Sequence, residues 1–100
     1  MKQFLIRYRR GNSTEAQWHQ DIQQFIGAVE SDPELAGRSG YRCMKVKDSS
    51  DYFHSATAAD DAAVKLLQGR EFFQRYNEKT RLVANGEVQV SPLEIIAETR

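Results

Sequence analysis

The order in which strand-like and helix-like periodicities follow one another most constrains how this 100-residue chain can fold. Apolar residues alternate at period two near the N-terminus, in two central segments and near the C-terminus. They recur at helical spacing in the two segments between. The predicted order is strand–helix–strand–strand–helix–strand, the ferredoxin-like split unit, in which an antiparallel sheet has both helices on one face. We therefore expect a single α+β domain over residues 1–100, with the other sheet face uncovered.

Four segments are predicted to be strands: residues 2–10, 41–47, 52–57 and 87–97. The two central segments predict a hairpin, because a run of Asp and Ser residues separates them. In the last segment Pro92 lacks a backbone donor, so it marks an edge, a bulge or a bend.

The first helix is expected to begin at Asn12 or Ser13, with Glu15 completing a capping box with Asn12. Apolar residues from Trp18 onward form one stripe of an amphipathic helix. Adjacent helix residues point in different directions. We therefore expect Trp18 in the core and His19 in solvent.

The second helix is expected to be capped by Asp60 or Asp61 and to have a weak point at Gly69. Its end has two interpretations. Asn85-Gly86 is either a helix C-cap followed by a strand or the two-residue turn of a hairpin. The cap is favoured, because the helical pattern continues through Leu82.

The charge balance, the single cysteine and the motifs that the sequence lacks limit the partners, compartment and cofactors expected for this chain. Lys+Arg and Asp+Glu are 14 each, so the chain lacks the excess positive charge on which nucleic-acid binding depends. The single cysteine, Cys43, cannot form an intramolecular disulfide and suits a reducing compartment.

We find neither a signal peptide nor an apolar run of membrane-spanning length, so we expect a cytoplasmic protein that binds no membrane. Motifs for metals or nucleotide cofactors are also missing, and none is expected to bind.

Five segments suggest a family: MKQFLIRYRR, EAQWHQDIQQFIGAVESDPELAG, YRCMKVKDSSDYFHSATAADDAA, REFFQRY and EVQVSPLEII. In element lengths and apolar positions they resemble the dimeric α/β-barrel superfamily, and most closely the antibiotic-biosynthesis-monooxygenase-like domains. The resemblance implies a homodimer whose sheets face each other and enclose a cavity per subunit. Superfamily members include oxygenases that act on phenolic polycyclic substrates without metal or flavin. The haem-degrading branch has Asn, Trp and His where this chain has Ile6, Thr57 and Tyr76, so we do not expect haem degradation.

His54 and Arg7 are the predicted catalytic residues. An imidazole in mid-strand has an ordinary pKa near physiological pH and can remove a phenolic proton as general base. The alternative is a structural histidine bonded to a backbone carbonyl or partly exposed. Arg7 lies opposite Phe4 and Ile6 on the first strand, so it faces the cavity if they face the helices. There it would hold an enolate or carboxylate, and with the faces reversed it would be a rim or salt-bridge residue.

Four aromatic residues are predicted to line the cavity: Tyr41, Tyr52, Phe72 and Tyr76. The same spacing also fits a plain hydrophobic core. Our first hypothesis is a cofactor-independent monooxygenase, or related small-molecule enzyme, that acts on an aromatic or polycyclic metabolite in a dimer-enclosed cavity. The second is a non-catalytic dimer that binds a small hydrophobic ligand or has a structural role.

Overall fold

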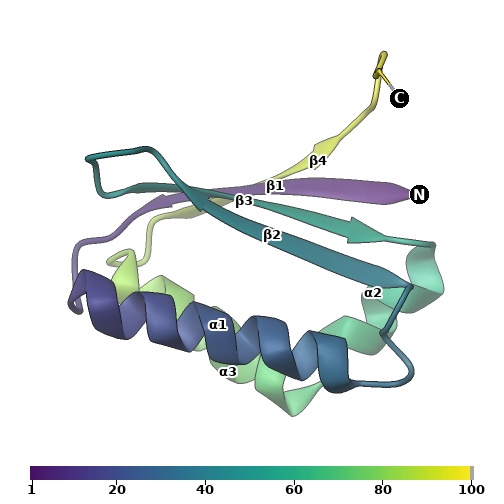
Figure 1. Ribbon diagram of the computed structural model, residues 1–100, viewed down its shortest axis with the longest axis horizontal. Coiled ribbons are helices and arrows are strands. Elements are labelled where there is room, and N and C mark those ends of the chain that lie inside the picture. Colours follow the sequence, from purple (N-terminus) through teal and green to yellow (C-terminus); the bar gives the residue numbers. More distant parts are fainter. Residues whose placement is uncertain (100) are drawn as a thin grey trace.

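One antiparallel sheet of four strands has all the helices on one of its faces (Figure 1). The computed structural model describes residues 1–99. The elements in chain order are β1 (Lys2–Arg9), α1 (Glu15–Ser31), β2 (Ser39–Lys45), β3 (Asp51–Ala58), α2 (Asp61–Gln68), α3 (Glu71–Val83) and β4 (Val88–Leu93). The strand order across the sheet is β2-β3-β1-β4. The predicted α+β, ferredoxin-like architecture is confirmed.

The strand register decides which side chains face the helices. Cys43 of β2, His54 of β3, Ile6 of β1 and Val90 of β4 pair in one row across the sheet. Because side chains alternate along a strand, this whole row lies on one face, and it is the face toward the helices. His54 therefore lies at the centre of the covered face.

The cap of α1 differs from the prediction. Thr14, and not Asn12 or Ser13, is the N-cap, and its Oγ1 accepts a hydrogen bond of 3.2 Å from the backbone N–H of Gln17. An N-cap residue needs extended backbone, which Thr14 has, whereas Ser13 has a positive φ of 69°. Asn12 instead donates from Nδ2 to the carbonyl of Leu82 at 2.8 Å.

The second predicted helix is two helices, and the break lies at the weak point expected at Gly69. Asp60 caps α2 by accepting a 2.8 Å hydrogen bond from the N–H of Ala63. At the end of α3, Asn85 and Gly86 both have left-handed backbone, with φ of 55° and 83°. The N–H of Gly86 donates to the carbonyl of Arg81 at 2.8 Å, so the helix C-cap is confirmed over the hairpin.

Strand ends were predicted less well than the strands themselves. The last strand ends at Leu93 and not at residue 97, and β2 lies two residues earlier than the predicted 41–47. Pro92 lies within β4, opposite Phe4 of β1. β4 is an edge of the sheet, which is where a residue without a backbone donor is tolerated.

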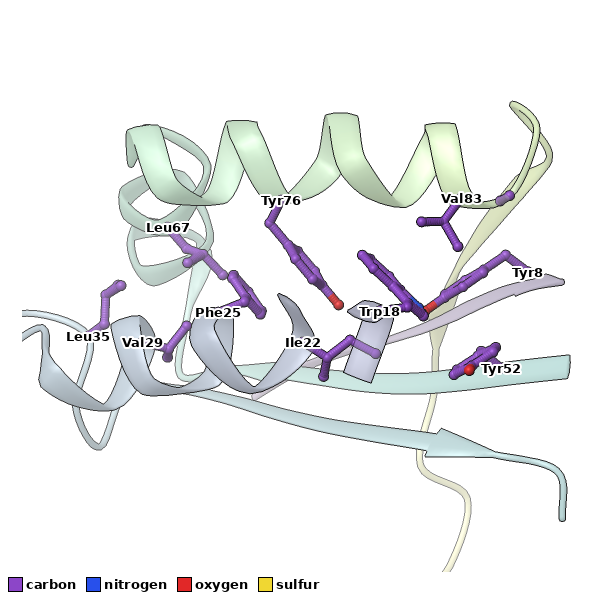
Figure 2. Packing of buried hydrophobic residues seen from close by; sticks show 11 residues of the cluster. Tyr8, Trp18, Ile22, Phe25, Val29, Leu35, Tyr52, Leu67, Tyr76 and Val83 are labelled. Carbon is purple, nitrogen blue, oxygen red and sulfur yellow. The ribbon is translucent and has the colours of Figure 1, made fainter. Parts of the chain in front are cut away.

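The core lies between the sheet and the helices α1 and α3, and Figure 2 shows its large side chains. Trp18 is completely buried, and burial of a large apolar side chain contributes about 1.5–3 kcal/mol to stability. The ring of Tyr76 stacks on Phe25 at 3.8 Å and on Trp18 at 5.8 Å between centroids. His19 was expected in solvent, but it is half-buried with Nε2 2.8 Å from the hydroxyl of Tyr52. Across residues 1–99, none of the helices has the length and apolar character needed to cross a membrane.

Candidate functional site

A cavity of about 460 Å³ lies between the sheet and the helices α2 and α3. It is lined by residues of all four strands on one side and of α2 and α3 on the other. Its principal lining residues are Phe4, Ile6, Tyr41, His54, Ala56, Val64, Leu67, Gln68, Phe73, Tyr76, Asn77, Thr80, Arg81, Val88 and Val90. A cavity of this size, mainly apolar with a few polar groups, is typical of small-molecule sites.

The helix wall of the cavity comes from one stripe of α3. Phe73, Tyr76, Asn77, Thr80 and Arg81 follow one another at spacings of three, one, three and one, which places them on a single helix face. The N-terminal part of this stripe is aromatic and the C-terminal part is polar, so the helix wall changes from apolar to polar along α3. Arg81 is solvent-exposed, so its charge lies at the rim.

His54 lines the cavity from β3, and only 1% of its surface is exposed. Its Nε2 lies 2.9 Å from the hydroxyl oxygen of Tyr8, and its Nδ1 lies 3.3 Å from that of Tyr76. Both ring nitrogens are therefore occupied, and Tyr76 links the imidazole to the helix wall of the cavity. Tyr8 also accepts a 2.9 Å hydrogen bond from the indole N–H of Trp18, and Figure 2 shows these two side chains meeting.

The environment keeps this cluster uncharged. Burial lowers the pKa of His54 to about 4, so the imidazole is neutral at physiological pH. Burial also raises the pKa of the hydroxyls of Tyr8, Tyr41 and Tyr76 above the ordinary tyrosine range. The same effect raises the pKa of the Cys43 thiol to about 11, despite an opposing hydrogen bond with Tyr76. None of these groups is ionised at neutral pH.

The predicted site residues separate into two groups. His54, Tyr41 and Tyr76 all line the cavity. Tyr52 lies instead beside a second, open groove between α1 and β2, where its hydroxyl meets His19. Phe72 packs against Phe25 with ring centroids 6.1 Å apart, while its neighbour Phe73 faces the cavity.

Arg7 lies on the opposite face of the sheet. Phe4 and Ile6 face the helices, so Arg7 points to the uncovered face of the sheet. For this orientation, the sequence predicts that Arg7 faces a cavity enclosed by a dimer. Its Nη2 donates to Oε1 of Gln89 at 2.6 Å. The cavity described above lies on the helix side of the sheet, so the sheet separates Arg7 from it.

On α3, three polar lining residues were not predicted: Asn77, Thr80 and Arg81. A signal for them exists, because they continue the helical stripe of Phe73 and Tyr76, but polar residues on such a stripe also fit a helix end near solvent. Within residues 1–99, no three His, Cys, Asp or Glu side chains are grouped so that they could hold a metal ion.

Comparison with known proteins supports the fold. No family model matches the chain, and no curated protein matches its sequence. SnoaB from Streptomyces nogalater, a cofactor-independent oxygenase, superposes with a TM-score of 0.77 at 11% identity, over 97% of this chain and 94% of that one. Rv0793 from Mycobacterium tuberculosis gives 0.77 at 11% identity, over 99% and 98%. An antibiotic biosynthesis monooxygenase gives 0.77 at 11% identity, over 97% and 100%. The chain thus has the fold of the antibiotic-biosynthesis-monooxygenase-like proteins, as the sequence resemblance implied.

Proposed function

We propose that this protein is a cofactor-independent monooxygenase that acts on an aromatic or polycyclic phenolic compound bound between the sheet and α2 and α3. The observation that supports it most is the cavity of about 460 Å³, whose apolar walls converge on the neutral, buried pair His54 and Tyr76. A planar aromatic body fits such walls, and the pair provides polar groups at one point. The shared fold with a cofactor-independent oxygenase adds support.

The chemistry requires little from the protein. A methylene carbon activated by a phenolic ring loses a proton, and the resulting carbanion adds O₂ to form a peroxide. Loss of the second C–H proton with cleavage of the O–O bond leaves a ketone and releases water. Conversion of the CH₂ group to C=O is a four-electron oxidation, and it matches the four-electron reduction of O₂, of which one atom ends in the ketone and the other in water. Exclusion of water and stabilisation of the anion are the protein's contributions.

The predicted roles of single residues depend on how the substrate lies. General-base catalysis by His54 requires an unprotonated Nδ1 toward Tyr76, with the substrate proton passing through that hydroxyl. Anion binding by Arg7 requires a substrate on the uncovered face, where Arg7 lies. Arg81 is the cation at the rim of the helix-side cavity. The role of His54 as general base and the role of Arg7 in anion binding stay predictions.

Oxygen uptake with an anthrone tests the proposal. In buffer made with ¹⁸O₂, enzymatic turnover should place one ¹⁸O atom in the anthraquinone carbonyl, at a rate proportional to protein concentration. The rate should fall in a variant with the cavity filled, Ala56→Phe, and stay unchanged in Leu82→Ala, on the exposed side of α3. Uptake no faster than in buffer, over a panel of anthrones and naphthols, would refute the proposal.

The second candidate function is binding of a small aromatic ligand without turnover. It is supported by the hydrogen bonds at both nitrogens of His54, which suit a structural histidine. This function predicts that aromatic compounds quench the fluorescence of Trp18, the one tryptophan, without oxygen uptake. Saturable quenching with no ¹⁸O incorporation would favour it over the oxygenase.

A further inference from the structure

The buried hydroxyl of Tyr8 has two partners among residues 1–99, and they restrict each other. The indole N–H of Trp18 can only donate, so it occupies one lone pair of the Tyr8 oxygen, at 2.9 Å. The other partner is Nε2 of His54, also at 2.9 Å. Tyr8 then has one hydrogen and one lone pair left to meet the imidazole.

The two imidazole tautomers differ in which tyrosine hydroxyl hydrogen, that of Tyr8 or that of Tyr76, lacks the imidazole as acceptor. If Nε2 bore the hydrogen, it would donate to Tyr8, and the O–H of Tyr8 would be buried without an acceptor. If Nε2 is unprotonated, Tyr8 donates to it, and the hydrogen that lacks the imidazole is that of Tyr76, which borders the cavity and the Cys43 thiol. A buried donor without an acceptor is costly, and among residues 1–99 the O–H of Tyr8 meets no acceptor other than His54, whereas that of Tyr76 borders the Cys43 thiol and the cavity. The second tautomer is therefore favoured, and it places the hydrogen on Nδ1.

This tautomer determines what the cavity presents. Nδ1–H of His54 donates to the oxygen of Tyr76, at 3.3 Å, so the hydrogen of the Tyr76 hydroxyl is not used by the imidazole. Tyr76 and His54 line the cavity, and Figure 2 shows Tyr76 reaching from α3 toward the sheet with its hydroxyl at the tip. The thiol of Cys43, the other neighbour of this hydroxyl, is a weak acceptor that an oxygen atom can replace.

We propose that Trp18 and Tyr8 are positioning residues that hold His54 in its Nδ1–H tautomer, so that Tyr76 donates a hydrogen bond to an acceptor oxygen, a ketone or phenolate, of the aromatic ligand. The inference rests on the proposed function only for the location of the site, and it names the chemical group the site selects. His54 then stabilises a developing oxyanion through Tyr76 in place of removing a proton.

The tautomer can be measured directly. Two-bond ¹H–¹⁵N correlation spectra of protein labelled at histidine distinguish Nδ1–H from Nε2–H, and a His19→Gln sample identifies the signal of His54. We expect Nδ1–H in the wild type and a mixture with Nε2–H in Tyr8→Phe. Tyr52→Phe is the matched control, because its ring stacks on Tyr8 at 5.2 Å while its hydroxyl bonds His19. An Nε2–H signal in the wild type would overturn the proposal even if no variant folds.

Ligand selection is tested with two planar probes of equal shape, 9-fluorenone, which has an acceptor oxygen, and fluorene, which lacks one. Trp18 stacks on Tyr76, so quenching of its fluorescence measures binding. Fluorenone should bind about tenfold more tightly than fluorene to the wild type and to Tyr52→Phe, and equally with fluorene to Tyr76→Phe. Equal binding of both probes to the wild type would contradict the proposal.

The outcomes separate this inference from the proposed function. An Nδ1–H signal with fluorenone preference but no oxygen uptake would refute the oxygenase and leave the donor site intact. Oxygen uptake with an Nε2–H signal would support the oxygenase and refute the role of Tyr8 and Trp18 in setting the tautomer.

Discussion

Tyr8 and His54 meet in the protein interior with Oη 2.9 Å from Nε2, although their backbones are not directly paired: His54 pairs with Ile6, and Tyr8 with Tyr52. Their rings are nearly perpendicular, with an angle of 82° and centroids 5.1 Å apart. The hydrogen bond therefore runs diagonally across two central strands. It joins a side chain of the hydrophobic core, Tyr8, to one that lines the cavity, His54.

The burial of His54 predicts a pH dependence of stability. Its pKa is about 4 in the folded protein and 6.5 in the unfolded chain, so between these values only the unfolded chain takes up the proton. The free energy of unfolding should therefore fall as the pH falls from 6.5 to 4, by roughly 3 kcal/mol in total. Urea titrations at several pH values measure it, and His54→Gln should remove this part of the slope. A slope that persists in His54→Gln would assign it to other groups.

Truncation of His54 should impair catalysis if the proposed function is right. In His54→Ala the hydroxyls of Tyr8 and Tyr76 both lose their imidazole partner. We expect the kcat for oxygen uptake to fall by about tenfold or more, with the circular dichroism spectrum retained. His19→Ala is the control, since His19 bonds Tyr52 beside the other groove. Unchanged turnover in His54→Ala would dismiss any role for the imidazole.

The corrected cap of α1 predicts different stabilities for neighbouring substitutions. Thr14→Ala removes the oxygen that accepts from the N–H of Gln17 and should cost about 1 kcal/mol of unfolding free energy. Ser13→Ala removes a hydroxyl that caps nothing in α1, so it should cost less. Thermal unfolding of both variants checks this, and a larger loss in Ser13→Ala would contradict the assignment of Thr14.

The uncovered sheet face predicts the oligomeric state. Leu5, Phe53 and Met44 lie on this face, and Met44 is 41% exposed. Native mass spectrometry should give twice 11.5 kDa for the wild type, because apolar side chains on an open sheet are best covered by a second copy. Phe53→Glu should weaken the dimer by about a hundredfold, whereas Leu82→Glu, on an exposed part of α3, should not. A monomeric wild type at micromolar concentration would exclude the dimer.

The sequence was sufficient for the fold and insufficient for the site, and particular residues show why. Element order follows from local periodicity, so the four strands, the first helix and the weak point at Gly69 could be predicted, whereas the division of the second helix into α2 and α3 was not. The cap could not, because the positive φ of Ser13 depends on how the chain leaves β1. The pKa of His54 is lowered by burial, and the residues that meet the buried imidazole, Tyr8 and Tyr76, are distant from it in sequence. Which sheet face borders the cavity likewise depends on where the helices pack, and this decided the place of Arg7.

The stacking of Tyr76 between Phe25 and Trp18 also has an entropic consequence. With parallel rings on both sides, at interplanar angles of 3° and 7°, the phenol cannot turn about its side-chain bonds without displacing its neighbours. Its rotational freedom was already lost when the chain folded. A ligand that reaches the hydroxyl therefore does not have to order it, and the affinity of the interaction is not reduced by that cost.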